Sequence, residues 1–252
     1  MMPGWLEAGL WGALAGGALL IGAAIAWFRR IPPRAIATIM AFGAGVLIAA
    51  LSFELLDEAE RTGGLLPTAA GFLGGACAYV AANALLARHG ARHRKRSGGQ
   101  QPSEADVQGS GAAIAVGALL DGVPESVVLG LSLLGGGDVG LAVVAAVFIS
   151  NIPEGLSSAA GMKRAGRGPG YVFGIWGGIA LAGGLAALLG NLALESASPA
   201  AVAVIMGVAA GAILAMVADT MIPEAFEDAH LLTGLITTVG FLTAFAVERL
   251  AA

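Results

Sequence analysis

The sequence predicts an all-α integral membrane protein in which eight transmembrane helices form a single domain over residues 1–252. The first observation behind this class is composition: 57% of the residues are apolar and only 12% are charged, about half the share of charged residues in a typical soluble domain. The second is a mean hydropathy of +0.84. The third is length, because a transmembrane helix takes about 20 residues and eight of them use about 160.

Apolar runs that end at charges, prolines or glycine clusters place the eight helices. The first run has no basic segment before it and is too long for the apolar part of a signal peptide, so we expect it to be a membrane helix. The polar stretch 88–110 is rich in Arg, Gln and Ser and predicts one flexible loop. The expected helices lie near 6–28, 35–56, 65–87, 111–134, 139–161, 170–193, 200–222 and 231–250.

Positive charge predicts the orientation of these helices. Eleven of the 13 Lys and Arg lie in the odd-numbered connections, which share one side of the membrane. Because basic loops stay in the cytoplasm, we expect these connections, with the 88–110 loop, to be cytoplasmic. Both termini are then expected outside a cell membrane, plasma or inner. The eleven residues are Arg29, Arg30, Arg34, Arg88, Arg92, Arg94, Lys95, Arg96, Lys163, Arg164 and Arg167.

Composition also excludes several classes of protein. Disorder needs low hydrophobicity, and the single cysteine, Cys77, excludes a disulfide scaffold and a four-cysteine zinc site. The net charge of −4, with no sustained basic face, argues against nucleic acid as a partner. The lipid bilayer is an expected partner, and a homodimer stays open.

Two internal repeats organise the chain. Residues 44–59 of the second helix resemble residues 210–225 of the seventh, at an offset of 166, and Val-Pro-Glu-Ser at 123–126 is echoed by Ile-Pro-Glu-Gly at 152–155. The second and seventh helices run in opposite directions, so helices 1–3 and 6–8 are predicted to be inverted repeats around helices 4 and 5. Inverted repeats with a central site are typical of transporters.

Three acids lie well inside the central helices. Asp121 and Glu125 belong to the fourth helix and Glu154 to the fifth, and no apolar run contains a basic partner for them. An acid near the bilayer centre costs about 2.5–3.5 kcal/mol. We therefore expect a proton, water or a cation to offset their charge.

Spacing favours a cation. Asp121 and Glu125 share a helix face at i,i+4, as do Ser150 and Glu154, with Asn151 beside them. Oxygen ligands suit hard or borderline divalent cations. The candidate metal ligands are therefore Asp121, Glu125, Ser150, Asn151 and Glu154. Two structural alternatives to metal binding stay open: a hydrogen bond from the Ser150 hydroxyl back to its own helix, and an interhelical hydrogen bond from Asn151.

Each central helix also carries a proline one residue before a glutamate. Pro124 and Pro153 lack an N–H, which frees the carbonyls of Leu120 and Ile149. Free backbone oxygens inside a membrane are tolerated where protein or a water-filled cavity satisfies them. The paired prolines thus predict either two more cation ligands or plain helix kinks.

With eight spans, a long third connection and these two Pro-Glu motifs, the chain resembles the ZIP family of divalent metal transporters. The resemblance implies metal binding at Glu125, Asn151 and Glu154 and zinc uptake into the cytoplasm, with the metal as substrate and no cofactor. Asp121 and Ser150 stand where the family has histidines. The family's carboxylate in the sixth helix is missing at 183–186, Gly-Gly-Leu-Ala in this chain.

All three histidines, His89, His93 and His230, lie outside the apolar runs, so the expected site binds through oxygen alone. Carboxylate in place of imidazole favours Mn²⁺ and Fe²⁺ relative to Zn²⁺. We therefore expect a broad selectivity that includes transport of Mn²⁺ or Fe²⁺. Glu54, Asp57, Glu58 and Glu60 could concentrate cations at an outer entrance to the path or form a solvated helix end. A second flanking group could form an exit on the cytoplasmic side: Glu224, Glu227, Asp228 and His230, with Asp219 one turn deeper.

Two other functions remain as alternatives. A non-transporting, metal-sensing relative would also bind metal. An intramembrane protease would use the Gly-x-Gly-Asp pattern at 135–138, but neither Tyr79 nor Tyr171 is followed by the partner Asp. We therefore expect no enzymatic activity.

Overall fold

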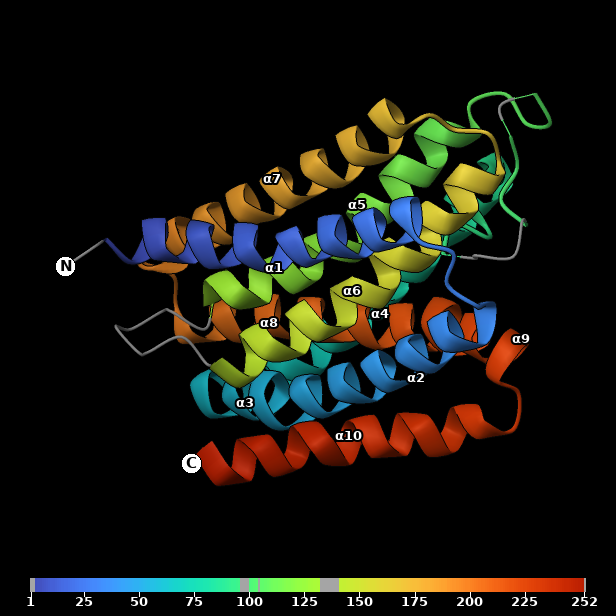
Figure 1. Cartoon of the computed structure of the whole chain (residues 1–252). Helices are drawn as coiled ribbons and strands as arrows, with labels where there is room; N and C mark the ends of the chain where they lie inside the picture. The colour runs from blue at the N-terminus through green and yellow to red at the C-terminus, as the bar shows by residue number, and fades with distance from the viewer. Residues whose placement is uncertain (1–2, 96–99, 104, 132–140, 252) are drawn as a thin grey trace.

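The structure, a computed structural model, describes residues 3–95, 100–103, 105–131 and 141–251. The described part is all-helical, and a helix occupies each predicted span (Figure 1). The helices are α1 (Gly4–Phe28), α2 (Pro33–Ala50), α3 (Leu56–Gly63), α4 (Leu65–Leu86), α5 (Ser110–Leu131), α6 (Leu141–Arg164), α7 (Pro169–Leu194), α8 (Pro199–Met216), α9 (Ile222–Ala229) and α10 (Leu232–Ala251).

Six helical stretches of the described chain are long and apolar enough to cross a membrane. They are Gly4–Phe28, Pro33–Gly63, Leu65–Ala91, Ser110–Leu131, Pro169–Leu194 and the 52-residue stretch Pro199–Leu250. The outer surface of the bundle is apolar as well, because large side chains such as Leu66, Leu73 and Leu181 are more than 60% exposed. A surface of this kind is stable in lipid and costly in water. The chain therefore has the character of a multi-pass membrane protein.

The same succession of elements occurs twice. Helix α2, a π-helical turn (Leu51–Leu55) and α3 are followed, at a constant offset of 166, by α8, a π-helical turn (Val217–Met221) and α9. The residue after each short helix has a positive φ, 86° at Gly64 and 48° at His230. Figure 1 shows α3 and α9 at opposite ends of the bundle, so the two bent helices point in opposite directions.

Close packing of small residues joins the helices, as the glycine spacing predicts. A Cβ at Gly16 of α1 would lie 2.7 Å from the Cα of Ala180 in α7, and one at Gly12 would lie 2.8 Å from the Cβ of Ala187. Helices α4 and α8 approach in the same way, as do α2 and α10. In lipid the hydrophobic effect does not drive helices to associate, so van der Waals packing of this kind holds them together.

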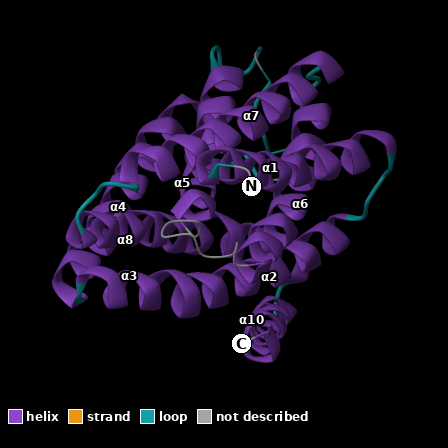
Figure 2. Cartoon of the chain, turned by 90° about the vertical axis from the view of Figure 1, so that its left-hand side faces the viewer, coloured by secondary structure: helices purple, strands orange, loops and turns teal. Residues whose placement is uncertain are grey.

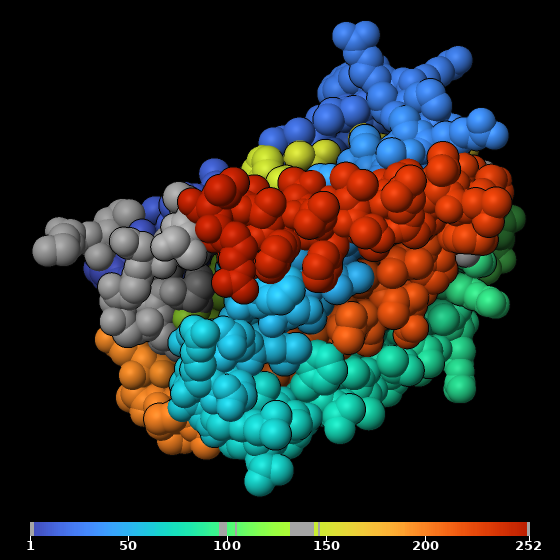
Figure 3. Space-filling model, turned by 90° about the horizontal axis from the view of Figure 1, so that it is seen from below, coloured from blue at the N-terminus to red at the C-terminus, as the bar shows by residue number. Residues whose placement is uncertain are grey.

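The central position belongs to α6, which packs between α1 and α2, while α5 packs against α7 (Figure 2). Helix α10 lies on the outside of the bundle along α2, as the space-filling view shows (Figure 3). Both termini lie at one end of the bundle, and the connections that follow α1, α4 and α6 lie at the other (Figure 1). The basic connections thus share one end.

The expectation of a flexible 88–110 loop is wrong for its described core. Arg94, Lys95 and Gln101 are 2%, 1% and 4% exposed, and the Gln101 amide donates to the carbonyls of Arg94 and Ser158. The segment enters the bundle because buried carboxylates attract it. Sequence composition alone does not reveal this partner.

Candidate functional site

Helices α5 and α6 bring all five predicted ligands into the interior of the bundle. Asp121 and Glu125 lie on α5, and Ser150, Asn151 and Glu154 lie on α6. Their exposed fractions do not exceed 4%. The i,i+4 spacing on each helix therefore points the acids inward, as expected.

Two cations from the connection after α4 reach these acids. Arg94 binds Asp121 with two parallel hydrogen bonds, from Nε to Oδ2 at 2.9 Å and from a terminal nitrogen to Oδ1 at 2.8 Å. The Tyr79 hydroxyl donates to the same Oδ1 at 2.8 Å, and the Asn83 side-chain oxygen accepts from Arg94 at 2.7 Å. Paired and hydrogen-bonded in this way, a buried carboxylate is satisfied.

Lys95 joins the two helices. Its Nζ lies 3.4 Å from Oδ2 of Asp121 and 3.0 Å from Oε1 of Glu154, and its backbone oxygen accepts a hydrogen bond from Ser157. Burial on its own would lower the pKa of the Lys95 ammonium, but the carboxylates of Asp121 and Glu154 outweigh this and hold that pKa above its ordinary value.

The premise that the membrane acids have no basic partner is therefore wrong. Arg94 and Lys95 lie outside the apolar runs in the sequence, yet both form ion pairs with acids inside them. Room for Arg94 comes from Gly117 of α5, where a Cβ would lie 2.5 Å from the arginine Cδ. A larger residue at 117 would push the guanidinium out.

Glu125 is the acid that stays without a cation. Both of its carboxylate oxygens are buried and accept no hydrogen bond from the described residues. Two cations face three acids, and the like charges of Glu154 and Asp121 act on Glu125. A buried, unpartnered carboxylate is costly, so this position calls for a proton or a further cation.

Ser150 and Asn151 each make a hydrogen bond inside the bundle. The Ser150 hydroxyl donates to the carbonyl of Val147 at 2.9 Å, the bond back to its own helix. The Asn151 amide nitrogen donates to the carbonyl of Ala15 in α1 at 2.9 Å, an interhelical bond. The Asn151 side-chain oxygen, however, is buried and accepts no hydrogen bond from the described residues. Its lone pairs therefore have no hydrogen-bond donor among the described residues.

Both prolines lie inside continuous helices, Pro124 in α5 and Pro153 in α6. Close packing surrounds the second: a Cβ at Gly43 of α2 would lie 3.3 Å from the Cα of Ser150 and 3.5 Å from Pro153. The Pro153 turn of α6 is thus packed closely against α2.

In the described chain, no three carboxylate, imidazole or thiolate side chains converge closely enough to hold a metal ion. The ammonium of Lys95 stands between Asp121 and Glu154. The ammonium therefore occupies the space between two of the predicted ligands.

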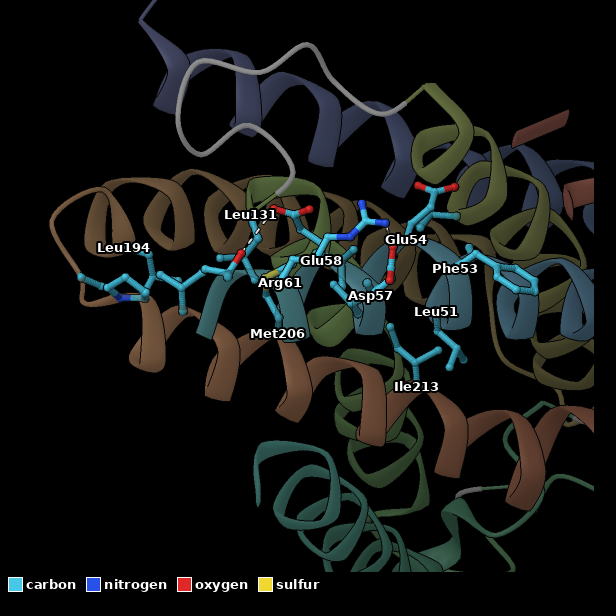
Figure 4. Close-up of a pocket in the computed structure, with 18 of the residues that line it drawn as sticks. Leu51, Phe53, Glu54, Asp57, Glu58, Arg61, Leu131, Leu194, Met206 and Ile213 are labelled. Atoms are coloured by element: carbon cyan, nitrogen blue, oxygen red, sulfur yellow. Dashed lines mark hydrogen bonds and ion pairs between the residues drawn. The ribbon is translucent and has the colours of Figure 1, made fainter. Parts of the chain in front are cut away.

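A cavity of about 580 Å³ opens at the end of the bundle that carries the termini. Glu54, Asp57 and Glu58, three of the four acids predicted to flank the path outside, line it together with Arg61, which pairs with Asp57 at 2.8 Å (Figure 4). Its walls also include Val128 and Val147. These residues are about one helical turn from Glu125 and Asn151, so the cavity approaches the acid cluster.

The acids of the second flanking group, expected on the cytoplasmic side, do not share one environment. Asp219 is exposed and lines another cavity, of about 410 Å³, together with His93 and Asn83. Glu224 is buried, whereas Glu227 is exposed and accepts from Gln100 at 3.4 Å. The Gly-x-Gly-Asp pattern at 135–138 lies outside the described residues.

Sequence reasoning missed the residues that complete the cluster. Tyr79 and Asn83 are polar residues four positions apart in an otherwise apolar helix, a signal that could have placed them on one inward face. Arg94 and Lys95 gave no such signal, because a basic run in a polar loop normally faces solvent.

In comparison with known proteins, no family model matches the chain and no curated protein matches it.

Proposed function

We propose that the chain transports a divalent metal cation through the bundle, with zinc uptake into the cytoplasm and breadth towards Mn²⁺ and Fe²⁺. The observation that carries the proposal is the buried cluster of three acids in which Glu125 keeps two carboxylate oxygens without a partner. Charged groups inside membrane proteins generally mark an ion path. The resemblance to the ZIP family, with its paired Pro-Glu motifs, points to the same substrate.

The repeated architecture supports transport. In an arrangement of eight spanning helices, the first three and the last three would form inverted repeats around α5 and α6. The acids would then lie between the two halves. The offset of 166 extends to the π-helical turns, so the repeat covers backbone geometry as well as sequence. Transporters built from inverted repeats bind their substrate near the midplane, between the halves.

Charge arithmetic explains how a metal could enter a cluster that already holds cations. Arg94 and Lys95 together carry two positive charges, and one divalent metal carries the same. Replacing both side chains by a metal leaves the net charge of the cluster unchanged, so the low-dielectric interior imposes no extra penalty for charge. We infer two states: a closed state in which the ion pairs of Arg94 and Lys95 satisfy the acids, and a loaded state in which the metal does so.

The two ends of the bundle fit this exchange. The cavity near Glu54 approaches the cluster from the end of the termini, which the charge bias places outside. The segment with Arg94 and Lys95 approaches from the basic end, which the same bias places in the cytoplasm. Metal would enter from outside and leave as the basic segment returns.

The experiment is uptake of Zn²⁺, Mn²⁺ and Fe²⁺ into proteoliposomes. We expect the wild type to move all three, Asp121→Ala to abolish or severely reduce uptake, and Asp121→His to shift the preference towards Zn²⁺. Strict selectivity for Zn²⁺ together with unchanged uptake by Asp121→Ala would show that Asp121 is not a ligand. Failure of the purified wild type to move any metal in the panel would contradict transport.

One observation favours a second function, a non-transporting metal sensor. The cations of Arg94 and Lys95 leave the cluster nearly neutral, as a structural ion-pair network would be. Saturable metal binding without flux into liposomes would favour the sensor. We propose no enzymatic activity, and peptide cleavage would contradict this.

A further inference from the structure

Four basic side chains surround one pocket at the basic end of the bundle. Arg29 and Arg30 come from the connection between α1 and α2, and Lys163 and Arg164 come from the last turn of α6. The pocket holds about 360 Å³. No carboxylate lies within ion-pair distance of these four cations in the described chain.

The floor of the pocket is apolar. Ala26 and Ile36 are buried, and Ile31 is half-buried. Phe28, the last residue of α1, is 75% exposed beside this floor in the sequence. This lining suits a ligand with an anionic head and an apolar tail.

Aromatic contacts place the pocket at the level of lipid headgroups. The Lys163 ammonium lies 5.1 Å above the ring of Trp27 and donates to the Trp27 carbonyl at 2.6 Å, while Trp27 packs edge-to-face on Phe173 at 6.1 Å. Tryptophan is enriched at the boundary between membrane and water. The basic rim and the apolar floor thus straddle that boundary.

A plainer reading is that the charges only mark the cytoplasmic side and offset the dipole of the α6 C-terminus. That reading explains why they are basic, but not why two separate connections converge on one hollow with no acid to neutralise them. Basic pockets between helix ends bind anionic lipid headgroups.

We propose that this pocket binds the phosphate headgroup of an anionic phospholipid, whose acyl chain lies along the apolar floor. The pocket contains no residue of the acid cluster, so the proposal stands whether or not the chain moves metal. The membrane is the source of the ligand, because a free phosphate would make no use of the floor.

The test compares phosphatidylglycerol, phosphatidylcholine and inorganic phosphate as ligands of the purified full-length chain, with retained lipid counted by native mass spectrometry. The variant is Arg30→Gln with Arg164→Gln, since neither side chain makes a hydrogen bond or ion pair among the described residues. Arg34→Gln with Arg88→Gln is the matched control: it removes the same charge at the same end, but outside the pocket.

We expect the wild type to prefer phosphatidylglycerol to phosphatidylcholine. The affinity should fall about fivefold per cation removed, so about 25-fold for the pocket variant, with little change in the control. Equal retention of both lipids by the wild type, or equal loss in the pocket and control variants, would overturn the proposal. So would full competition by inorganic phosphate at the lipid's own concentration.

Should the double variant fail to fold, the single variant Arg164→Gln is expected to show the fivefold loss alone. No loss in a folded single variant would count against the site.

Discussion

At the scale of single residues, the acid cluster separates into paired and unpaired carboxylates. Asp121 accepts hydrogen bonds from Arg94 and Tyr79, whereas the oxygens of Glu125 accept none from the described residues. This difference predicts opposite effects on stability for two chemically similar substitutions.

Asp121→Asn should destabilise the metal-free protein by about 3 kcal/mol, because it leaves buried cations with less negative charge. Glu125→Gln should leave the stability nearly unchanged or raise it, because it removes a charge that lacks a partner. Thermal unfolding in detergent without metal measures both. Equal losses in the two variants would contradict the assignment of Glu125 as the open position.

Lys95 gives the second prediction at this scale. Lys95→Met keeps an unbranched side chain one atom shorter but removes the ammonium between Asp121 and Glu154, and we expect a loss of about 3–5 kcal/mol without metal. Added Mn²⁺ should restore more stability to this variant than to the wild type, because the metal no longer competes with the ammonium. Arg92→Met, on an exposed neighbour, is the control and should respond to metal as the wild type does.

At the scale of elements, the close approach of α4 and α8 rests on glycine. A Cβ at Gly211 would collide with the carbonyl of Phe72, whereas one at Gly74, an exposed position of α4, meets no atom within 4 Å. Gly211→Ala should cost about 1–3 kcal/mol through overpacking, and Gly74→Ala should cost nothing. Chemical or thermal unfolding distinguishes them, and a tolerated Gly211→Ala would show that the two helices are not so close.

The end of α9 carries backbone strain. His230 has φ 48° and ψ −127°, a backbone conformation that residues other than glycine seldom adopt. Its counterpart 166 positions earlier is Gly64. His230→Gly should therefore stabilise the protein by about 1 kcal/mol, and Gly64→Ala should destabilise it by a similar amount. A destabilised His230→Gly would mean that the imidazole makes contacts that outweigh the strain.

At the scale of the whole molecule, periodic and repeated features were predictable from sequence. Helices such as α1 and α7 follow their apolar runs within about two residues, since long apolar segments have few alternatives in lipid. The repeat at 166 follows from residues 44–59 and extends to the π-helical turns.

The ion pairs that Arg94 and Lys95 form with the buried acids were not predictable from sequence. Arg94 and Lys95 reach the acids only after the chain turns back at Ala87–Ala91, where His89 and Gly90 leave helical geometry. No local pattern encodes a contact between a polar loop and a buried carboxylate 27 positions away. Long-range ion pairs depend on the tertiary arrangement.

The most direct test of the account is equilibrium binding of Mn²⁺ to the purified protein, measured by dialysis. We expect saturable binding by the wild type, and its loss in Glu125→Gln with Glu154→Gln. The control, Glu58→Gln with Glu60→Gln, removes two acids outside the cluster and should keep the binding. Absence of saturable binding in the wild type, or its persistence in the Glu125–Glu154 double variant, would contradict the claim that the buried acids form a divalent-cation site.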